Sequence, residues 1–269
     1  MKTIPFLLII VCCVGCFQIE DEPERSIRDG ATVEFVTPVG EATMPANEDW
    51  QTVATGIEER VIVPPQSAIA QMVVMRLDPN QVIFRVHYQP NTPLTLDQWR
   101  TALPTAQVIV NANFFTPEHT ITGMLVSDGQ FYGTSFTDRG GMFSIQNGLP
   151  VIQQLPVLPY DGRALEQAIQ AFPMLVTGGS AAYNRPNDTR GSRRTAVGMD
   201  TSGRVLLFST PGIGLGLHDL SQYLASTDLG ISEAFNLDGG GSTMLYLAPT
   251  NYAISSFDPV PAVLAIYNR

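Results

Sequence analysis

From Trp50 onward the chain contains many short runs in which apolar and polar residues alternate or apolar residues follow one another. Such runs, bounded by Pro, Gly, Asn or Asp, are typical of β-strands. The sequence Asp200-Thr201-Ser202-Gly203 between two of them predicts a tight hairpin turn. We expect strands over residues 59–63, 69–77, 81–88, 107–111, 123–126, 143–146, 151–155, 196–199, 204–209, 235–237, 244–247 and 263–267.

Three segments instead carry apolar residues at helical spacing. Residues 94–100 predict a short helix with Thr95 as its N-cap, and residues 162–171 predict a second helix. Residues 217–227 predict an amphipathic third helix. These helices do not alternate regularly with the strands, so repeated βαβ units are not expected. The expected fold class is α+β, as a single domain with a mixed β-sheet core and a few flanking helices.

The first 16 residues resemble an export signal. Met1 and Lys2 precede an apolar run over residues 4–14, which is too short to span a membrane comfortably. Val14-Gly15-Cys16 resembles a bacterial lipoprotein signal, in which Cys16 becomes the lipidated first residue. An ordinary cleaved signal and an uncleaved anchor are the alternatives. We expect an exported protein that is anchored by this lipid to the membrane of the bacterial cell envelope.

Residues 17–48 are acidic with scattered Pro and Gly, and they predict a tether between the lipid and a folded domain over residues 49–269. An ordered edge strand around residues 31–37 is the alternative. Composition then narrows the chemistry of the domain. The net charge is −10 and no basic stripe is present, so nucleic-acid binding is not expected.

All three cysteines lie within the first 16 residues, and Lys2 is the only lysine. The folded domain therefore has no disulfide, no thiolate metal site and no lysine for Schiff-base or P-loop chemistry. The chain also lacks a calcium-loop spacing and a histidine cluster. We expect neither a metal nor another cofactor.

The stretch Asn236-Leu237-Asp238-Gly239-Gly240-Gly241-Ser242 is the most informative part of the sequence. A carboxylate follows an apolar strand and precedes three glycines, which permit a tight backbone turn and the close approach of a ligand. This arrangement predicts Asp238 on the floor of a pocket, beside backbone N–H groups that face a ligand. A glycine-rich hairpin in which Asp238 caps the turn is the alternative.

Two further polar clusters also adjoin apolar strands. Asn111 and Asn113 lie two residues apart, so on an extended chain their amides point the same way and suit sugar hydroxyls. The alternative is that they close a strand-end turn. One arginine of the pair Arg193-Arg194 is expected to face inward, where its planar guanidinium matches phosphate or carboxylate oxygens. A solvated surface pair is the alternative.

Five motifs follow one another along the chain: VNANFF at 110–115, Gly123 with Asp128-Gly129, FPMLV at 172–176, RTAVGMD at 194–200 and NLDGGGS at 236–242. In this order they resemble the phosphodiester glycosidase family, from about Trp50 to Arg269. The resemblance implies hydrolysis of a sugar-1-phosphodiester or a related α-glycoside, with a carbohydrate or glycan phosphodiester as substrate. It also implies an active site gathered around Asn111, Arg194, Asp238 and the loop to Ser242.

Glycosyl hydrolysis ordinarily uses two carboxyl groups. Asp238 is expected to be the catalytic base or nucleophile, and Arg194 to bind the departing phosphate. The expected substrate-binding residues are Asn111, Asn113, Thr195, Gly239, Gly240 and Ser242. Candidates for the second carboxyl group are Glu118, Asp128, Asp138 and Asp200, each alternatively a solvated loop acid, and candidate histidines are His119 and His218.

Two other functions fit the same sequence. A non-catalytic glycan-binding lipoprotein of the envelope would use the same pocket without turnover. A structural envelope protein would use the glycines only to shape turns, and it would show no saturable sugar binding. The presence of both Asp238 and Arg194 favours the enzyme.

Overall fold

The computed structural model describes residues 47–65, 67 and 69–269. The predicted signal segment, Cys16 and residues 17–46 of the predicted tether lie outside the described residues. Strand β1 begins at Asn47. The last two residues of the range predicted as a tether therefore belong to a strand.

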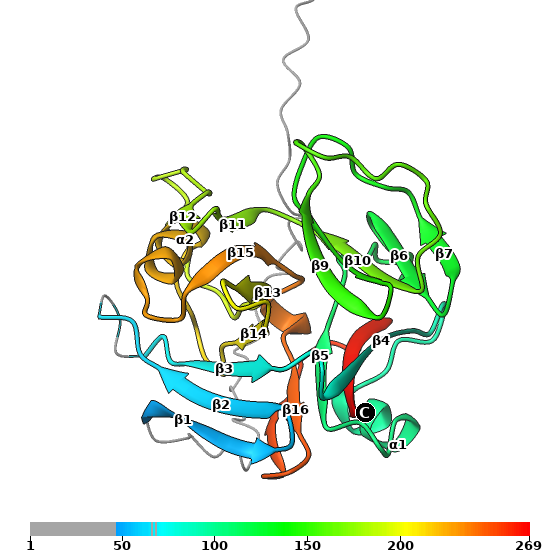
Figure 1. Ribbon diagram of the computed structural model, residues 1–269, viewed down its shortest axis with the longest axis horizontal. Coiled ribbons are helices and arrows are strands. Elements are labelled where there is room, and N and C mark those ends of the chain that lie inside the picture. Colours follow the sequence, from blue (N-terminus) through cyan, green and yellow to red (C-terminus); the bar gives the residue numbers. More distant parts are fainter. Residues whose placement is uncertain (1–46, 66, 68) are drawn as a thin grey trace, which may run out of the picture. The chain divides into compact units, whose positions relative to one another are not determined.

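The large sheet has eight strands in the order β1-β2-β3-β14-β13-β15-β11-β12, and neighbouring strands are antiparallel. Figure 1 shows this sheet with α2 beside β11 and β12. Its strands are β1 (Asn47–Ala54), β2 (Ile57–Ile62), β3 (Met72–Leu77), β11 (Met174–Thr177), β12 (Ser180–Ala181), β13 (Thr195–Asp200), β14 (Val205–Ser209) and β15 (Ile231–Asn236).

Two five-stranded antiparallel sheets complete the fold, with the orders β7-β6-β10-β8-β9 and β17-β16-β5-β18-β4. We call them the β6 sheet and the β5 sheet. The β6 sheet contains β6 (Met124–Ser127), β7 (Gln130–Gly133), β8 (Gly141–Gln146), β9 (Leu149–Gln154) and β10 (Gln167–Ala171). The β5 sheet contains β4 (Val82–Tyr88), β5 (Val108–Asn111), β16 (Leu245–Leu247), β17 (Tyr252–Ile254) and β18 (Ala262–Asn268).

The described residues form two α-helices, α1 (Leu96–Ala102) and α2 (Leu217–Ser226), and a 3₁₀ turn, η1 (Gly240–Ser242). The predicted N-cap of α1 is confirmed. The Thr95 hydroxyl accepts a hydrogen bond from the Gln98 amide, and the Gln98 side chain accepts one from the Thr95 amide, which forms a capping box. The amphipathic helix expected near residue 217 and the hairpin turn at 200–203 are confirmed as well.

Apolar side chains from all three sheets meet in one core. It includes Met75 and Leu207 of the large sheet, Phe143 of the β6 sheet, and Val110 and Leu264 of the β5 sheet. Successive side chains of a strand point to opposite faces of the sheet. The side chains on the other face of the large sheet are also apolar, and α2 packs on them. Helix α1 covers the β5 sheet in the same way through the buried Trp99.

The α+β expectation is wrong, and the fold is predominantly β. Strands hold 43% of the described residues and helices hold 9%, and the strand pairs in the three sheets are antiparallel. The clearest error is the helix expected over residues 162–171, where strand β10 stands instead.

Two glutamines in β10 explain this error. They look like the polar side of an amphipathic helix, but both are buried. The Gln167 side chain accepts a hydrogen bond from the backbone amide of Val86, and that of Gln170 accepts bonds from the amides of Met124 and Phe136. Buried amides that pair with the backbone are compatible with the interior of a sheet. The polar positions therefore did not mark a solvent-facing side.

Candidate active site

Asn111 joins three segments that are distant in the sequence. It is the last residue of β5 and only 1% exposed. Its Oδ1 accepts hydrogen bonds from the Thr195 hydroxyl at 2.7 Å and from the Met244 amide at 3.0 Å. Its Nδ2 donates to the backbone carbonyl of Asp238 at 2.6 Å. One buried amide thus fixes the start of β13, the first residue of the glycine loop (residues 238–243) and Met244, the residue that follows the loop.

Backbone hydrogen bonds hold the glycine loop against the same two strands. The Asp238 amide donates to the carbonyl of Ala112 at 3.1 Å, directly after β5. The Leu237 amide donates to the carbonyl of Thr195 at 2.9 Å, and the Gly240 amide donates to that of Arg193 at 2.8 Å. Hydrogen bonds therefore hold the loop to the end of β5 and to the start of β13, and it is not a free surface turn.

Steric contacts or backbone conformation explain why each of the three loop positions is a glycine. A Cβ on Gly239 would lie 2.8 Å from the carbonyl oxygen of Arg193. Gly240 has a φ of +59°, a conformation that glycine adopts without strain. A Cβ on Gly241 would lie 2.2 Å from a carboxylate oxygen of Asp258. The glycines allow both a protein backbone and a second carboxylate to approach the loop closely.

The carboxylate of Asp238 lies at the partly exposed end of this loop. Its Oδ1 accepts a hydrogen bond from the Gly239 amide at 2.9 Å, and residues 238–241 are all partly exposed. Ser242 is buried, and its amide donates to the carbonyl of Gly239 at 3.1 Å. Residues 238–241 of the loop are thus partly exposed, whereas its two hydroxyl residues, Ser242 and Thr243, are buried.

The two arginines before β13 have different environments. Arg193 is 5% exposed, and its Nη2 donates to the carbonyls of Thr243 at 3.0 Å and Ser255 at 2.8 Å. Arg194 is partly exposed, and its guanidinium donates to the carbonyls of Leu215 at 3.4 Å and Arg190 at 3.3 Å. Burial identifies Arg193 as the inward arginine. Arg194 is the accessible cation beside Thr195.

Asn113 lies in a different environment from Asn111. Strand β5 ends before it, and its Nδ2 donates to the carbonyls of Met124 at 3.0 Å and Gln170 at 2.9 Å. The next residue, Phe114, packs on Phe172 with ring centroids 4.9 Å apart. The side chain of Asn113 therefore connects to the β6 sheet, and only that of Asn111 reaches the glycine loop.

The sequence around these residues shows to which protein family the chain belongs. Residues 104–267 match the sequence profile described as phosphodiester glycosidase. The chain belongs to the phosphodiester glycosidase family. The matched range includes Asn111, Arg194 and the whole glycine loop.

Three solved structures share the fold. The catalytic domain of zebrafish N-acetylglucosamine-1-phosphodiester alpha-N-acetylglucosaminidase, auto-inhibited by its pro-peptide, is 18% identical with a TM-score of 0.62, and the match covers 81% of this chain and 85% of that one. A hypothetical protein from Synechocystis is 15% identical (TM-score 0.57; 79% and 62% covered). A protein from Burkholderia pseudomallei is 13% identical (TM-score 0.56; 80% and 76% covered). No curated protein matches the sequence.

The four acids predicted as candidates for the second carboxyl group contact residues outside the glycine loop. Glu118 and Asp138 are exposed, and a hydrogen bond with the Thr116 side chain lowers the pKa of Glu118. Asp128 accepts a hydrogen bond from Gln167 at 2.7 Å, beside β10. Asp200 is buried in the β13–β14 turn, where it bonds to Ser202 and Arg204.

The two candidate histidines lie on other segments. His119 stacks on Phe115 with ring centroids 5.8 Å apart. The Nδ1 of His218 lies 3.3 Å from the carbonyl oxygen of Tyr183, at the start of α2. These contacts tie the histidines to their local segments.

Sequence reasoning missed Asp258, the acid that lies against Gly241. It stands in Phe257-Asp258-Pro259, outside every motif used for the resemblance. A third adjacent glycine was the only signal, because it implied that something approaches the loop closely. The residue that does so cannot be read from local sequence.

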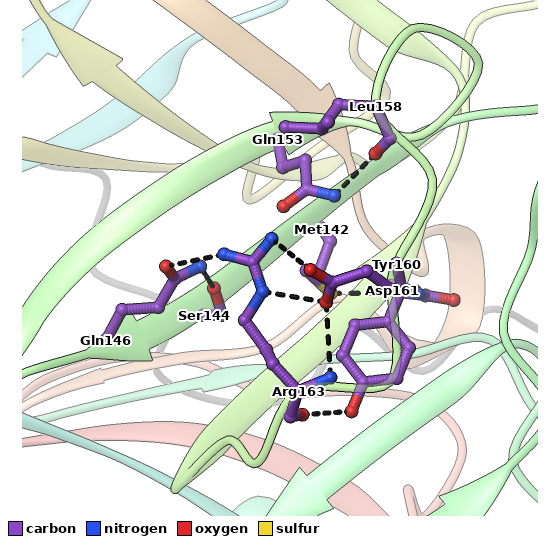
Figure 2. A network of polar contacts seen from close by, with 9 residues as sticks. Met142, Ser144, Gln146, Gln153, Leu158, Tyr160, Asp161 and Arg163 are labelled. Atoms are coloured by element: carbon purple, nitrogen blue, oxygen red, sulfur yellow. Dashed lines mark hydrogen bonds and ion pairs between the residues drawn. The ribbon is translucent and has the colours of Figure 1, made fainter.

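A second polar network lies on the β6 sheet, beside a hollow of about 290 Å³ lined in part by Gln153 and Glu233. In Figure 2 the Arg163 guanidinium lies between Asp161 and Gln146. Hydrogen bonds from Arg163 lower the pKa of Asp161 to about 2. This network holds the connection from β9 to β10, and no residue of the glycine loop lines the hollow.

The described part of the chain has no group of three or more His, Cys, Asp or Glu side chains placed to hold a metal ion. Within the same residues, no helix is both long enough and apolar enough to span a membrane.

Proposed function

We propose that this protein is an exported glycosidase that hydrolyses a sugar-1-phosphodiester or a related α-glycoside. Asp238 acts as the base or nucleophile, and Arg194 binds the phosphate. The observation that carries the proposal is the Asn111 anchor, which holds the backbone of Asp238 beside Thr195, the neighbour of Arg194. Membership of the phosphodiester glycosidase family supports the same reaction class.

The environment of Asp238 suits an anionic catalyst. The Gly239 amide donates to its carboxylate, and hydrogen bonds of this kind stabilise the charged form. The carboxylate lies on a loop that hydrogen bonds hold on both sides, so little reorganisation accompanies the reaction. Partial exposure leaves it accessible to the anomeric carbon of a bound sugar.

A phosphate leaving group explains the proposed role of Arg194. The phosphate departs as a stabilised anion, so a cation that binds it contributes more than an acid that protonates it. The Arg194 guanidinium is held by two backbone carbonyls and is partly exposed. The zebrafish relative is named for a sugar phosphodiester, which supports the same substrate class here.

The substrate-binding role of the remaining predicted residues is part of the proposal. Gly239 and Gly240 offer partly exposed backbone to a ligand, and Thr195 and Asn111 support that surface from below. Asn113 and Ser242 are buried, so we propose that they shape the walls of the site. Lipid attachment at Cys16 would hold the enzyme at the envelope membrane.

A turnover screen tests the function. Purified protein is offered a panel of sugar-1-phosphodiesters and aryl α-glycosides, with Asp238→Asn as the control. Saturable sugar binding without turnover would support the glycan-binding alternative instead. Neither binding nor turnover across the panel would indicate a structural envelope protein.

Arg194→Ala is expected to slow hydrolysis of phosphodiesters by about 100-fold, and hydrolysis of neutral aryl α-glycosides by less than about tenfold. The reason is that only the phosphodiester develops negative charge where the guanidinium binds. Steady-state kcat/KM on both substrates measures the difference. Arg190→Ala is the matched control, because it removes a neighbouring exposed guanidinium. Equal losses on both substrates would contradict a phosphate-binding role.

A further inference from the structure

A second carboxylate, that of Asp258, occupies the space that a side chain at residue 241 would fill. Its Oδ2 lies 2.2 Å from the position of a Cβ built on Gly241. Real Cβ atoms do not approach another atom so closely, so the carboxylate can lie there only because residue 241 is a glycine. The φ of Gly241 is not in the left-handed region. Close approach, and not backbone strain, is therefore the reason for glycine at this position.

The backbone at Asp258 and at the residue before it is fixed to the glycine loop. The amides of Phe257 and Asp258 both donate to the Gly241 carbonyl, at 2.7 Å and 3.1 Å. Arg193 binds the carbonyl of Ser255 and lies 4.4 Å from the centre of the Phe257 ring. Two independent sets of contacts thus hold Asp258 in place.

The carboxylates of Asp238 and Asp258 both contact the backbone of residues 239–241. Asp238 accepts a hydrogen bond from the amide of Gly239, and Asp258 packs on Gly241, two residues further along. Asp238, Gly241 and Asp258 are all partly exposed. The two acids are therefore held on the same glycine loop, one at its start and one against its third glycine.

We propose that Asp258 is the second catalytic carboxylate of this site, and that it accepts the proton of the hydrolytic water. This inference rests on the proposed function and assigns Asp238 the nucleophilic role. Glycosidases that pass through a covalent glycosyl-enzyme use two carboxyl groups, one as the nucleophile and one as the acid or base. A phosphate leaving group needs no protonation, so both acids can work as carboxylates.

The reaction then has two balanced steps. In the first step a carboxylate oxygen of Asp238 bonds to the anomeric carbon, and the bond to the phosphate oxygen breaks with its electron pair, which releases a phosphate monoester anion. In the second step water attacks the anomeric carbon and gives its proton to Asp258. The bond to Asp238 breaks and returns its electron pair to that carboxylate. Asp258 later passes the proton to solvent.

Asp258→Asn tests this assignment on a substrate that the wild-type enzyme turns over. The first step needs no base, so we expect a burst of one equivalent of leaving group, followed by turnover about 100-fold slower than wild type. Intact-protein mass spectrometry should show one added sugar, and peptide mapping should locate it on Asp238. Azide should accelerate turnover by an Asp258→Ala variant, because it attacks without losing a proton. Asp161→Asn, which neutralises an exposed acid bound to Arg163, should behave as wild type.

Gly241→Ala tests the same inference without changing either acid. Its Cβ would displace the Asp258 carboxylate, so it should reproduce the burst and the trapped sugar while the melting temperature stays near that of the wild type. Gly212→Ala is the matched control, because its Cβ would lie no closer than 3.8 Å to the nearest atom, the carbonyl oxygen of Ile69.

The outcomes separate the two proposals. Wild-type kinetics in Asp258→Asn and Gly241→Ala would overturn this inference and leave the proposed function standing. Slow turnover of folded Asp258→Asn without a burst or a sugar adduct would also overturn it. An inactive wild-type protein across the whole substrate panel would overturn the proposed function, and this inference with it.

Discussion

Replacing Asp238 by Asn should lower kcat by about 100- to 10,000-fold while the protein stays folded. Asparagine keeps an oxygen that can accept the hydrogen bond of the Gly239 amide, so the loop retains its local contact. It removes the negative charge and the basicity that attack on the anomeric carbon requires. Steady-state kinetics on the best substrate of the panel, with the melting temperature as a check on folding, measure the effect.

The matched control for this variant is Asp161→Asn. Asp161 is an exposed acid bound to Arg163 in the connection from β9 to β10, and no residue of the glycine loop lines the hollow beside it. Its replacement should leave kcat within about twofold, since surface changes away from the site have small effects. Near wild-type turnover by pure, folded Asp238→Asn would overturn the assignment of the catalytic carboxylate.

Asn111→Ala should lower the free energy of unfolding by about 3 kcal/mol, because it leaves buried polar partners without their bonds. The partners are the Thr195 hydroxyl, the Met244 amide and the Asp238 carbonyl. For a domain of this size the melting temperature should fall by about 6–12 °C, as calorimetry can measure. Turnover should fall as well, because the backbone of Asp238 loses its anchor.

Asn80→Ala is the control for this second change. Asn80 is exposed and bonds only within its own turn, to the side chain of Asp78. Its replacement should shift the melting temperature by no more than about 2 °C. If Asn111→Ala melted within that same margin, the convergence of three segments on Asn111 would not be what holds the glycine loop.

Elements with a strong local signal could be predicted from the sequence. The capping box at Thr95, the amphipathic pattern of α2 and the turn after β13 depend on residues close together in the chain, and the structure contains all three. Strand β10 shows where such reasoning stops. Gln167 and Gln170 find backbone partners on other strands, and no local pattern reveals those partners.

The candidate site shows the same limit. The glycine loop and its carboxylate are visible in the sequence because they are contiguous. The partners of the Asn111 side chain cannot be read from the sequence, because its amide could equally have closed a turn at the end of its own strand. Asp258 is harder still, since its position depends on how the segment before β18 returns to the loop.

Strand β18 has a consequence for when this site comes into existence. It lies between β4 and β5 in the sheet, so neither of those earlier strands is fully paired until β18 has been synthesised. The segment that brings Asp258 to Gly241 immediately precedes it. A nascent polypeptide that lacks β18 therefore cannot yet hold Asp258 against Gly241 in this way. If the protein is exported as an unfolded chain, its hydrolytic activity is expected to begin only after translocation.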